Sequence, residues 1–226
     1  MCNYIILSSK IWNKDLVDQL KEYDYECNWH FISKKEEFNI EVLEKIKPNK
    51  IFIPHWSHII PENIFAYYEC IVFHMTDLPY GRGGSPLQNL IVDGVESTKI
   101  SAIKVIKELD AGPIYLKNNL SLYGTAEEIF IRANSVIFNM INKIKNEKLK
   151  PKEQKGEISL FKRRTPSMSS IEELNEIEEV FNHIRMLDAD GYPQAYFETD
   201  KFKFEFTRGS LKADKSIIAD VRITKK

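Results

Sequence analysis

The chain has 226 residues, of which 43% are hydrophobic and 29% are charged, a composition typical of a soluble protein with a substantial core. Its formal net charge of −1 excludes a field over the whole molecule that would draw it onto a nucleic acid or an anionic membrane. No apolar stretch approaches the ~20 residues needed to cross a bilayer, and the three cysteines lack metal-binding spacing. We therefore expect a cytoplasmic protein without a disulfide framework or a metal site.

The first third of the chain alternates short apolar runs with amphipathic segments. Strands are predicted at 3–7, 29–32, 50–54 and 70–73, and a charged helix at 34–46. Another helix, capped by Asn13 or Asp15, is predicted to run through Tyr23. Strands that alternate with helices in this way are typical of βαβ units. We expect an α/β fold with a Rossmann-like, mostly parallel sheet and helices on both faces.

The rest of the chain continues this pattern and then changes character. Further elements are predicted as a helix at 85–92, strands at 99–105 and 113–117, and a long helix after Thr125, which forms a capping box with Glu128. The segment 146–156 is polar and lysine-rich, typical of a linker. A helix at 170–185 and an antiparallel ribbon at 196–206 follow it. These features predict a first domain at 1–150 and a C-terminal α/β segment at 151–226.

One histidine is followed by an unusual concentration of glycine and proline. Residues 73–86 read FHMTDLPYGRGGSP, in a chain with only nine glycines and nine prolines. His74 falls at the carboxyl end of a predicted strand, the edge of an open α/β sheet where ligands bind. By position alone it is as easily structural as functional, but glycines that let the backbone approach a ligand favour function. The GxGxxG and Walker A patterns are absent.

Asp110, in the sequence LDAG, follows the predicted strand at 99–105. Alone it is an ordinary turn residue. Because His74 and Asp110 both follow strands of one predicted sheet, we expect the two side chains to meet across its carboxyl edge.

The segments CIVFHMTDLPYGRGGSPLQNLIVDG and ISAIKVIKELDAG resemble the folate-dependent formyltransferases, a family that includes methionyl-tRNA, glycinamide ribonucleotide and sugar N-formyltransferases. The positions that match the family pattern are His74, Leu78, Pro79, Arg82, Gly83, Pro86, Asp110 and Gly112. NHIRMLDADGYPQAYF, near the end of the chain, is similar to the family's C-terminal segment. The family usually carries an asparagine two residues before the histidine, and here Val72 stands in its place.

The resemblance implies transfer of a formyl group from N10-formyltetrahydrofolate, the expected co-substrate, to an amine. His74 would stabilise the oxyanion and Asp110 would accept the proton of the amine. Cofactor-binding roles are expected for Trp56, Leu78, Pro79, Tyr80, Gly81, Arg82, Gly83 and Gly84. Trp56 could instead be a core residue, and Arg82 could bind a phosphate or form a salt bridge. Because Val72 stands where the family usually has asparagine, one expected oxyanion donor is missing. A catalytically inactive binding protein is therefore an alternative.

The acceptor is not named by these motifs. A short tail after the linker and a net charge near zero argue against tRNA, which needs a broad cationic surface. We expect a nucleotide-linked amino deoxy sugar, with UDP-4-amino-4,6-dideoxy hexoses of the pseudaminic acid branch favoured and another small amine as the alternative. Acceptor-binding roles are expected for Ser9, Lys10, Trp12, Met75, Thr76 and Arg163. No nucleic acid or membrane partner is expected, and a homodimer remains an option.

Overall fold

The computed structural model describes residues 2–226, which form two compact units. The first unit contains the chain up to Arg82 together with Lys99–Leu120 and Arg132–Leu160. The second contains Gly83–Thr98, Ser121–Ile131 and Phe161–Lys226. The predicted boundary at residue 150 stays a prediction.

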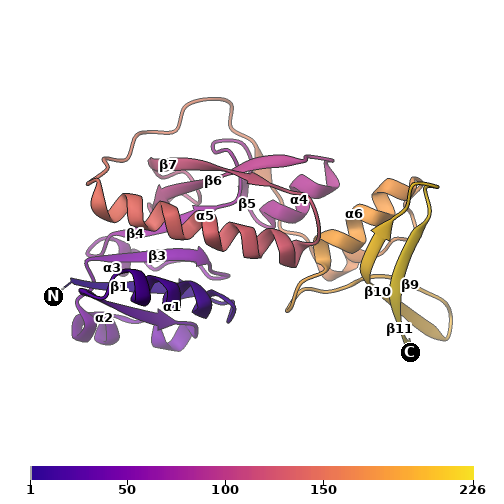
Figure 1. Ribbon diagram of the computed structural model, residues 1–226, viewed down its shortest axis with the longest axis horizontal. Coiled ribbons are helices and arrows are strands. Elements are labelled where there is room, and N and C mark those ends of the chain that lie inside the picture. Colours follow the sequence, from indigo (N-terminus) through magenta and orange to yellow (C-terminus); the bar gives the residue numbers. More distant parts are fainter. Residues whose placement is uncertain (1) are drawn as a thin grey trace. The chain divides into compact units, whose positions relative to one another are not determined.

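The first unit is built on a six-stranded sheet in the order β2-β1-β3-β4-β6-β7 (Figure 1). The strands are β1 (Cys2–Ser8), β2 (Cys27–Ile32), β3 (Lys50–His55), β4 (Cys70–His74), β6 (Ser97–Lys104) and β7 (Ile114–Ser121). Strands β2, β1, β3 and β4 pair in parallel, whereas β6 runs antiparallel to β4. The prediction of a mostly parallel sheet is confirmed.

Helices cover both faces of this sheet, as the near-continuous apolar strands predict. They are α1 (Asn13–Tyr23), α2 (Ile40–Ile46), α3 (Glu62–Phe65) and α5 (Ala126–Asn146). On one face, Ile5 and its neighbours pack with Leu43 of α2 and Ile64 of α3. On the other face, the rings of Tyr23 in α1 and Phe138 in α5 lie 5.5 Å apart, so these two helices are neighbours. Two-sided burial explains why β1, β3 and β4 have near-continuous apolar runs rather than a polar face.

In the first unit, the predicted start of one helix and the predicted side-chain cap of another are wrong. The helix expected at 34–46 divides into a 3₁₀ turn (Lys35–Glu37) and α2, because Asn39 is extended and its side chain accepts the amide of Val42 at 3.0 Å. Helix α1 begins without a side-chain cap. The Asn13 side chain is used elsewhere, in hydrogen bonds with Ser8 and Asn134. The predicted capping box of α5 is confirmed by reciprocal bonds between Thr125 and Glu128.

The expectation of a chain without disulfides is also wrong. Cys2 and Cys27 form a disulfide with a Cα–Cα distance of 4.8 Å. The parallel register of β1 and β2 places the two residues directly opposite each other. Their separation of 25 residues matches no spacing motif, so only strand pairing brings them together. Among residues 2–226, no helix is long and apolar enough to cross a membrane.

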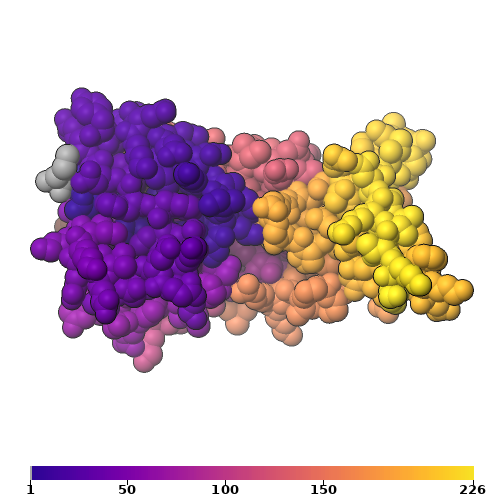
Figure 2. Space-filling model, turned by 90° about the horizontal axis from the view of Figure 1, so that it is seen from below, coloured from indigo at the N-terminus to yellow at the C-terminus, as the bar shows by residue number. Residues whose placement is uncertain are grey.

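The second unit contains two helices and a three-stranded antiparallel sheet, whose strands lie at the surface in yellow in Figure 2. Its elements are α4 (Pro86–Val92), a 3₁₀ turn (Pro166–Ser169), α6 (Ile177–Leu187), β9 (Ala195–Glu198), β10 (Phe202–Leu211) and β11 (Ile217–Lys225). The predicted ribbon is confirmed as β9 and β10, where Phe197 stacks on Phe204 at 4.5 Å. The helix predicted from residue 170 starts later, because Glu176 and Glu179 form its capping box.

Candidate active site

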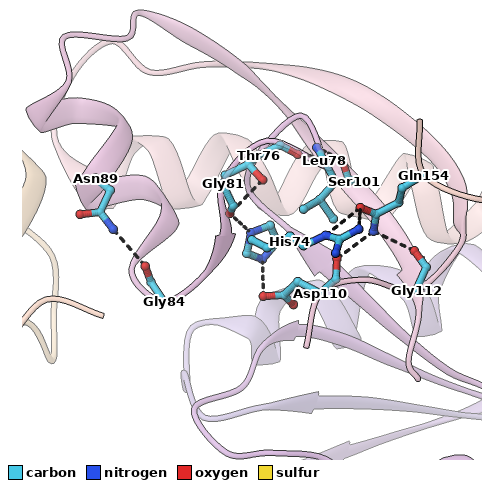
Figure 3. Close-up of polar contacts among 11 residues, drawn as sticks. His74, Thr76, Leu78, Gly81, Gly84, Asn89, Ser101, Asp110, Gly112 and Gln154 are labelled. Atoms are coloured by element: carbon cyan, nitrogen blue, oxygen red, sulfur yellow. Dashed lines mark hydrogen bonds and ion pairs between the residues drawn. The ribbon is translucent and has the colours of Figure 1, made fainter. Parts of the chain in front are cut away.

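His74 is the last residue of β4 and is 6% exposed. Its ring Nε2 donates to the carbonyl of Gly81 at 2.8 Å, since a carbonyl can only accept. Its Nδ1 lies 3.7 Å from the carboxylate of Asp110 (Figure 3). The prediction that these two side chains lie close together is confirmed, and their catalytic roles remain a prediction.

Asp110 reaches the histidine by a route that the sequence did not predict. Strand β6 is antiparallel to β4 and ends at Lys104, opposite Ile71 near the start of β4. The two strands therefore do not end at one edge of the sheet, and the loop between β6 and β7 brings Asp110 back to His74. Asp110 is left-handed at φ +52°, an uncommon conformation for a residue with a side chain. In the same loop, a Cβ on Gly112 would lie 1.7 Å from the Lys104 carbonyl, which explains the glycine.

The loop after β4 is shaped by hydrogen bonds to its backbone. Ser101, opposite His74 on β6, donates to the Thr76 carbonyl at 2.7 Å and accepts the Leu78 amide at 3.3 Å. The amide of Gly81 donates to the hydroxyl of Ser159 at 2.7 Å. These bonds hold the loop that carries the Gly81 carbonyl, which accepts the hydrogen bond from His74 Nε2.

Two lysines hold the same loop through Asp77. Lys117 donates to the Asp77 carboxylate and to the Leu78 carbonyl, and Lys99 pairs with Asp77 at 2.9 Å. Burial by itself raises the pKa of Asp77, but the hydrogen bonds from Lys117 and Lys99 outweigh it and hold that pKa below its usual value. The loop is therefore anchored by charge as well as by backbone bonds.

Arg82 is buried in a polar network. Its Nη1 donates to Glu108 at 3.2 Å, and its Nε and Nη2 donate to the side-chain oxygen of Gln154 at 3.1 and 2.9 Å. The nitrogen of Gln154 in turn donates to the carbonyls of Asp110 and Gly112, at 2.8 and 2.9 Å (Figure 3). Of the two roles considered for Arg82, the structure contains the salt bridge.

The other residues expected to bind the cofactor have varied surroundings. Leu78 is fully buried, Pro79 is buried, and Tyr80 is exposed. A Cβ on Gly83 would lie 2.4 Å from the Phe161 carbonyl, so this glycine allows a close approach within the chain itself. A Cβ on Gly84 would likewise meet Arg163. The cofactor roles of these residues stay predictions.

Trp56 has the core packing that was one of the two alternatives for it, and its cofactor role stays a prediction. Its ring packs edge-on against Phe38 at 6.0 Å, beside the apolar cluster on one face of the sheet. Its Nε1 is buried and has no hydrogen-bond partner among the described residues. A tryptophan that is largely core can therefore still present one donor to a ligand.

The residues expected to bind the acceptor are divided between the two units. Ser9 accepts the amide of Ser57 at 3.2 Å, and the Lys10 ammonium lies over the Trp12 ring at 4.9 Å. Met75 and Thr76 are buried next to His74 in the chain. Arg163 is exposed in the second unit. Their acceptor roles remain untested predictions.

A second buried polar cluster lies at the carboxyl ends of β1 and β3. The Asn13 side-chain oxygen accepts from Ser8 at 2.6 Å and lies 3.2 Å from His55 Nδ1. The Asn13 amide donates to Asn134 at 2.6 Å. Desolvation of the ring, with a smaller contribution from the charge of Lys10, lowers the pKa of His55 to about 4. This histidine is therefore neutral at physiological pH.

Sequence reasoning missed the residues that support the candidate pair. They are Ser101, Glu108, Lys117, Gln154 and Ser159. A single glutamine in the lysine-rich stretch 146–156 has no motif around it, and that stretch was expected to be a linker. Instead, Lys152 exchanges two backbone hydrogen bonds with Ile114 at the start of β7.

Comparison with known proteins identifies relatives for both parts of the chain. A family model described as formyl transferase matches residues 10–130, and one described as methionyl-tRNA formyltransferase, C-terminal domain, matches 166–224. Methionyl-tRNA formyltransferase of Thermotoga maritima is 28% identical over 167 residues, 70% of this chain and 53% of the relative. The chain thus spans about half the length of the curated relatives it matches.

Solved structures extend the likeness over the whole chain. A methionyl-tRNA formyltransferase from Clostridium thermocellum is 46% identical, covers 100% of both chains and has a TM-score of 0.97. The formyltransferase PseJ from Anoxybacillus kamchatkensis, in complex with UDP-4,6-dideoxy-4-formamido-L-AltNAc and tetrahydrofolate, is 17% identical, covers 70% of this chain and 85% of its own, and has a TM-score of 0.56. At that identity, PseJ shares the fold alone.

These relatives overturn the expected acceptor and the expectation of no nucleic acid partner. The similar sequences and the full-length structural match are named methionyl-tRNA formyltransferases, not sugar enzymes. The argument from a short tail and a net charge near zero was wrong, because residues 166–224 match a C-terminal domain of such proteins and net charge does not limit local binding. With one model matching just over half of its residues and the histidine–aspartate pair in place, the chain belongs to the formyl transferase family.

Proposed function

We propose that this protein transfers a formyl group from N10-formyltetrahydrofolate to the amino group of methionyl-tRNA. The observation that carries the proposal is the match to the Clostridium thermocellum methionyl-tRNA formyltransferase over 100% of both chains at 46% identity. The match of residues 166–224 to the C-terminal domain model supports the same acceptor. N10-formyltetrahydrofolate is the formyl donor of this family.

The candidate pair has the chemistry that amine formylation needs. The Nε2 proton of His74 is committed to the Gly81 carbonyl, so Nδ1 is the ring atom that faces Asp110. A proton on Nδ1 would stabilise negative charge that develops on the formyl oxygen. The Asp110 carboxylate, as general base, would take the proton that the amine loses, and a proton would pass to N10 as the bond between N10 and the formyl carbon breaks and tetrahydrofolate leaves. Both side chains are nearly buried, which strengthens these electrostatic interactions.

The residues around the pair fit a folate. Bound N10-formyltetrahydrofolate would supply an activated formyl group. The indole Nε1 of Trp56 is a buried donor without a partner among the described residues, and the indole itself is a flat ring. A hydrogen-bond donor and a flat ring that can stack both suit a pterin. Tyr80, exposed in the loop after β4, is a further ring that could contact the cofactor. The amides of Leu78 and Gly81, which donate to the hydroxyls of Ser101 and Ser159, would hold this loop in shape while it binds.

The test is a formylation assay with three acceptors. Purified protein and N10-formyltetrahydrofolate are incubated with methionyl-tRNA, with free methionine, or with a UDP-linked 4-amino sugar. We expect formylmethionine on the tRNA alone, and none from the His74→Asn variant. Formylation of the sugar but not of the tRNA would refute the proposal. Formylation of no acceptor, with folate still bound, would instead support the inactive binding protein that Val72 raised as an alternative.

A further inference from the structure

We infer that Gln154 is a positioning residue, which holds the loop of Asp110 in its catalytic geometry and ties it to the loop that bonds His74. The inference rests on the proposed function for its kinetic test. Gln154 lies outside the pattern that identifies the family motifs, in a stretch whose composition predicts a linker. It touches neither candidate catalytic side chain, and it acts through the backbone of one of them.

The contacts of Gln154 join two separate parts of the site. Its amide nitrogen donates to the carbonyls of Asp110 and Gly112, on either side of Ala111. Its oxygen accepts two bonds from Arg82, the residue after Gly81. Arg82 also bonds Glu108, so both ends of the segment 108–112 are held by one network.

The conformation of Asp110 makes this support necessary. A left-handed non-glycine residue carries backbone strain and persists only where its surroundings determine it. The Gln154 bond to the carbonyl of Asp110 acts directly on the strained residue. Rotation of that residue would move a carboxylate that now lies 3.7 Å from His74 Nδ1.

Only a side-chain amide satisfies both groups of partners. The backbone carbonyls of Asp110 and Gly112 can only accept, and the guanidinium of Arg82 can only donate. A glutamate at position 154 could accept from Arg82, but it would have no proton for the two carbonyls. The chemistry therefore predicts that Gln154→Glu keeps the Arg82 contact and loses the bonds to the Asp110 loop.

Ser159, five positions after Gln154, shows that the same segment also contacts the loop that bonds His74. Its hydroxyl accepts the Gly81 amide at 2.7 Å, and its carbonyl accepts the Arg82 amide at 3.0 Å. The carbonyl of Gly81 in turn accepts from His74. The chain from Gln154 to Ser159 thus contacts the backbone beside both members of the candidate pair.

The experiment compares Gln154→Glu and Gln154→Ala with a matched control, Glu153→Gln, at the exposed neighbouring position. Formylation of methionyl-tRNA is measured as kcat and as KM for both substrates, together with amide hydrogen exchange at Ala111 and Gly112. For Gln154→Glu we expect kcat to fall on the order of 10- to 100-fold, with both KM values within about threefold of the parent. Exchange at Ala111 and Gly112 should accelerate in this variant, and Glu153→Gln should match the parent throughout.

Each outcome decides the inference. Unchanged exchange at Ala111 and Gly112 in Gln154→Glu, or an unchanged kcat, would overturn it. A rise in KM at constant kcat would assign Gln154 to substrate binding and would also overturn it. Should Gln154→Ala fail to fold, Gln154→Glu still tests the role, because it keeps the Arg82 partner. If the parent protein does not formylate methionyl-tRNA, the proposed function fails, while the exchange measurement still tests the positioning role.

Discussion

Two histidines stand at the carboxyl ends of neighbouring parallel strands, and their surroundings differ in one decisive respect. His55, at the end of β3, meets the side chain of Asn13, and desolvation lowers its pKa to about 4. His74, at the end of β4, meets the carbonyl of Gly81 on one side and the carboxylate of Asp110 on the other. Both residues lie at the edge of the sheet, but the charged group that acts on the pKa of His55 is Lys10, after desolvation, whereas His74 lies beside a carboxylate.

This difference separates a structural histidine from a candidate catalytic one. A neutral amide neighbour cannot balance a charge, so burial keeps His55 neutral. A carboxylate beside a ring nitrogen can exchange a proton with it or with a substrate between them. The position of a histidine on the sheet, which His55 and His74 share, is therefore a weaker indicator of function than the group that its second nitrogen faces.

The largest effect is expected from substitutions of the candidate catalytic pair, His74 and Asp110. His74→Asn and Asp110→Asn should each lower kcat for formylation by ~10²–10⁴-fold, because each removes one group that acts on charge or protons in the transition state. His55→Asn is the matched control, and we expect it to keep the parent kcat within about threefold. Steady-state kinetics of the three folded variants measure this. A parent-like rate in Asp110→Asn would remove the aspartate from the mechanism.

An effect of intermediate size is expected on the acid stability of the protein, through protonation of His55. Because the pKa of His55 is lowered from 6.5 to about 4, the unfolded state binds more protons between these values. Above pH 6.5 protonation of His55 does not affect the free energy of unfolding. As the pH falls from 6.5 to about 4, this protonation lowers the free energy of unfolding by about 3 kcal/mol.

Denaturant unfolding of the parent and of His55→Asn, at several pH values across that window, measures the difference. The free energy of unfolding of the parent should fall more steeply on acidification than that of the variant. Parallel pH dependences would show that His55 does not titrate as its burial implies, and the contrast with His74 would then be lost.

The smallest effect is expected from substitution of Val72, which lies in β4 with His74. Val72 lies two residues before His74, opposite Ile53 and Ile103, and packs against the apolar cluster that includes Ile51. Val72→Asn would restore the usual family residue but place a polar group in this packing, at a cost of ~1–3 kcal/mol in unfolding free energy. We expect kcat/KM within about tenfold of the parent.

Val72→Ala provides the control for lost packing without an added amide. Thermal unfolding and formylation kinetics of both variants are compared with the parent. A gain of about three decades in Val72→Asn, from a nearly inactive parent, would show that this chain has lost an oxyanion donor that the family requires.

Much of the architecture was predictable from local pattern. Apolar runs of strand length, separated by amphipathic segments, predicted the parallel strands and the helices on both faces. The Thr125–Glu128 spacing predicted the start of α5. His74 and Asp110 were identified by their family motifs. These features are short in sequence, and each depends on side-chain periodicity or on a few adjacent residues.

The tertiary structure decided the features that depend on the path of the backbone. The antiparallel direction of β6 sends the Asp110 loop back to His74 from the opposite edge of the sheet. The register of β1 and β2 pairs Cys2 with Cys27. Gln154 meets the carbonyl of Asp110, 44 positions earlier in the chain. A hydrogen bond to a backbone carbonyl needs no particular residue at the accepting position, so such a contact leaves no pattern in the sequence.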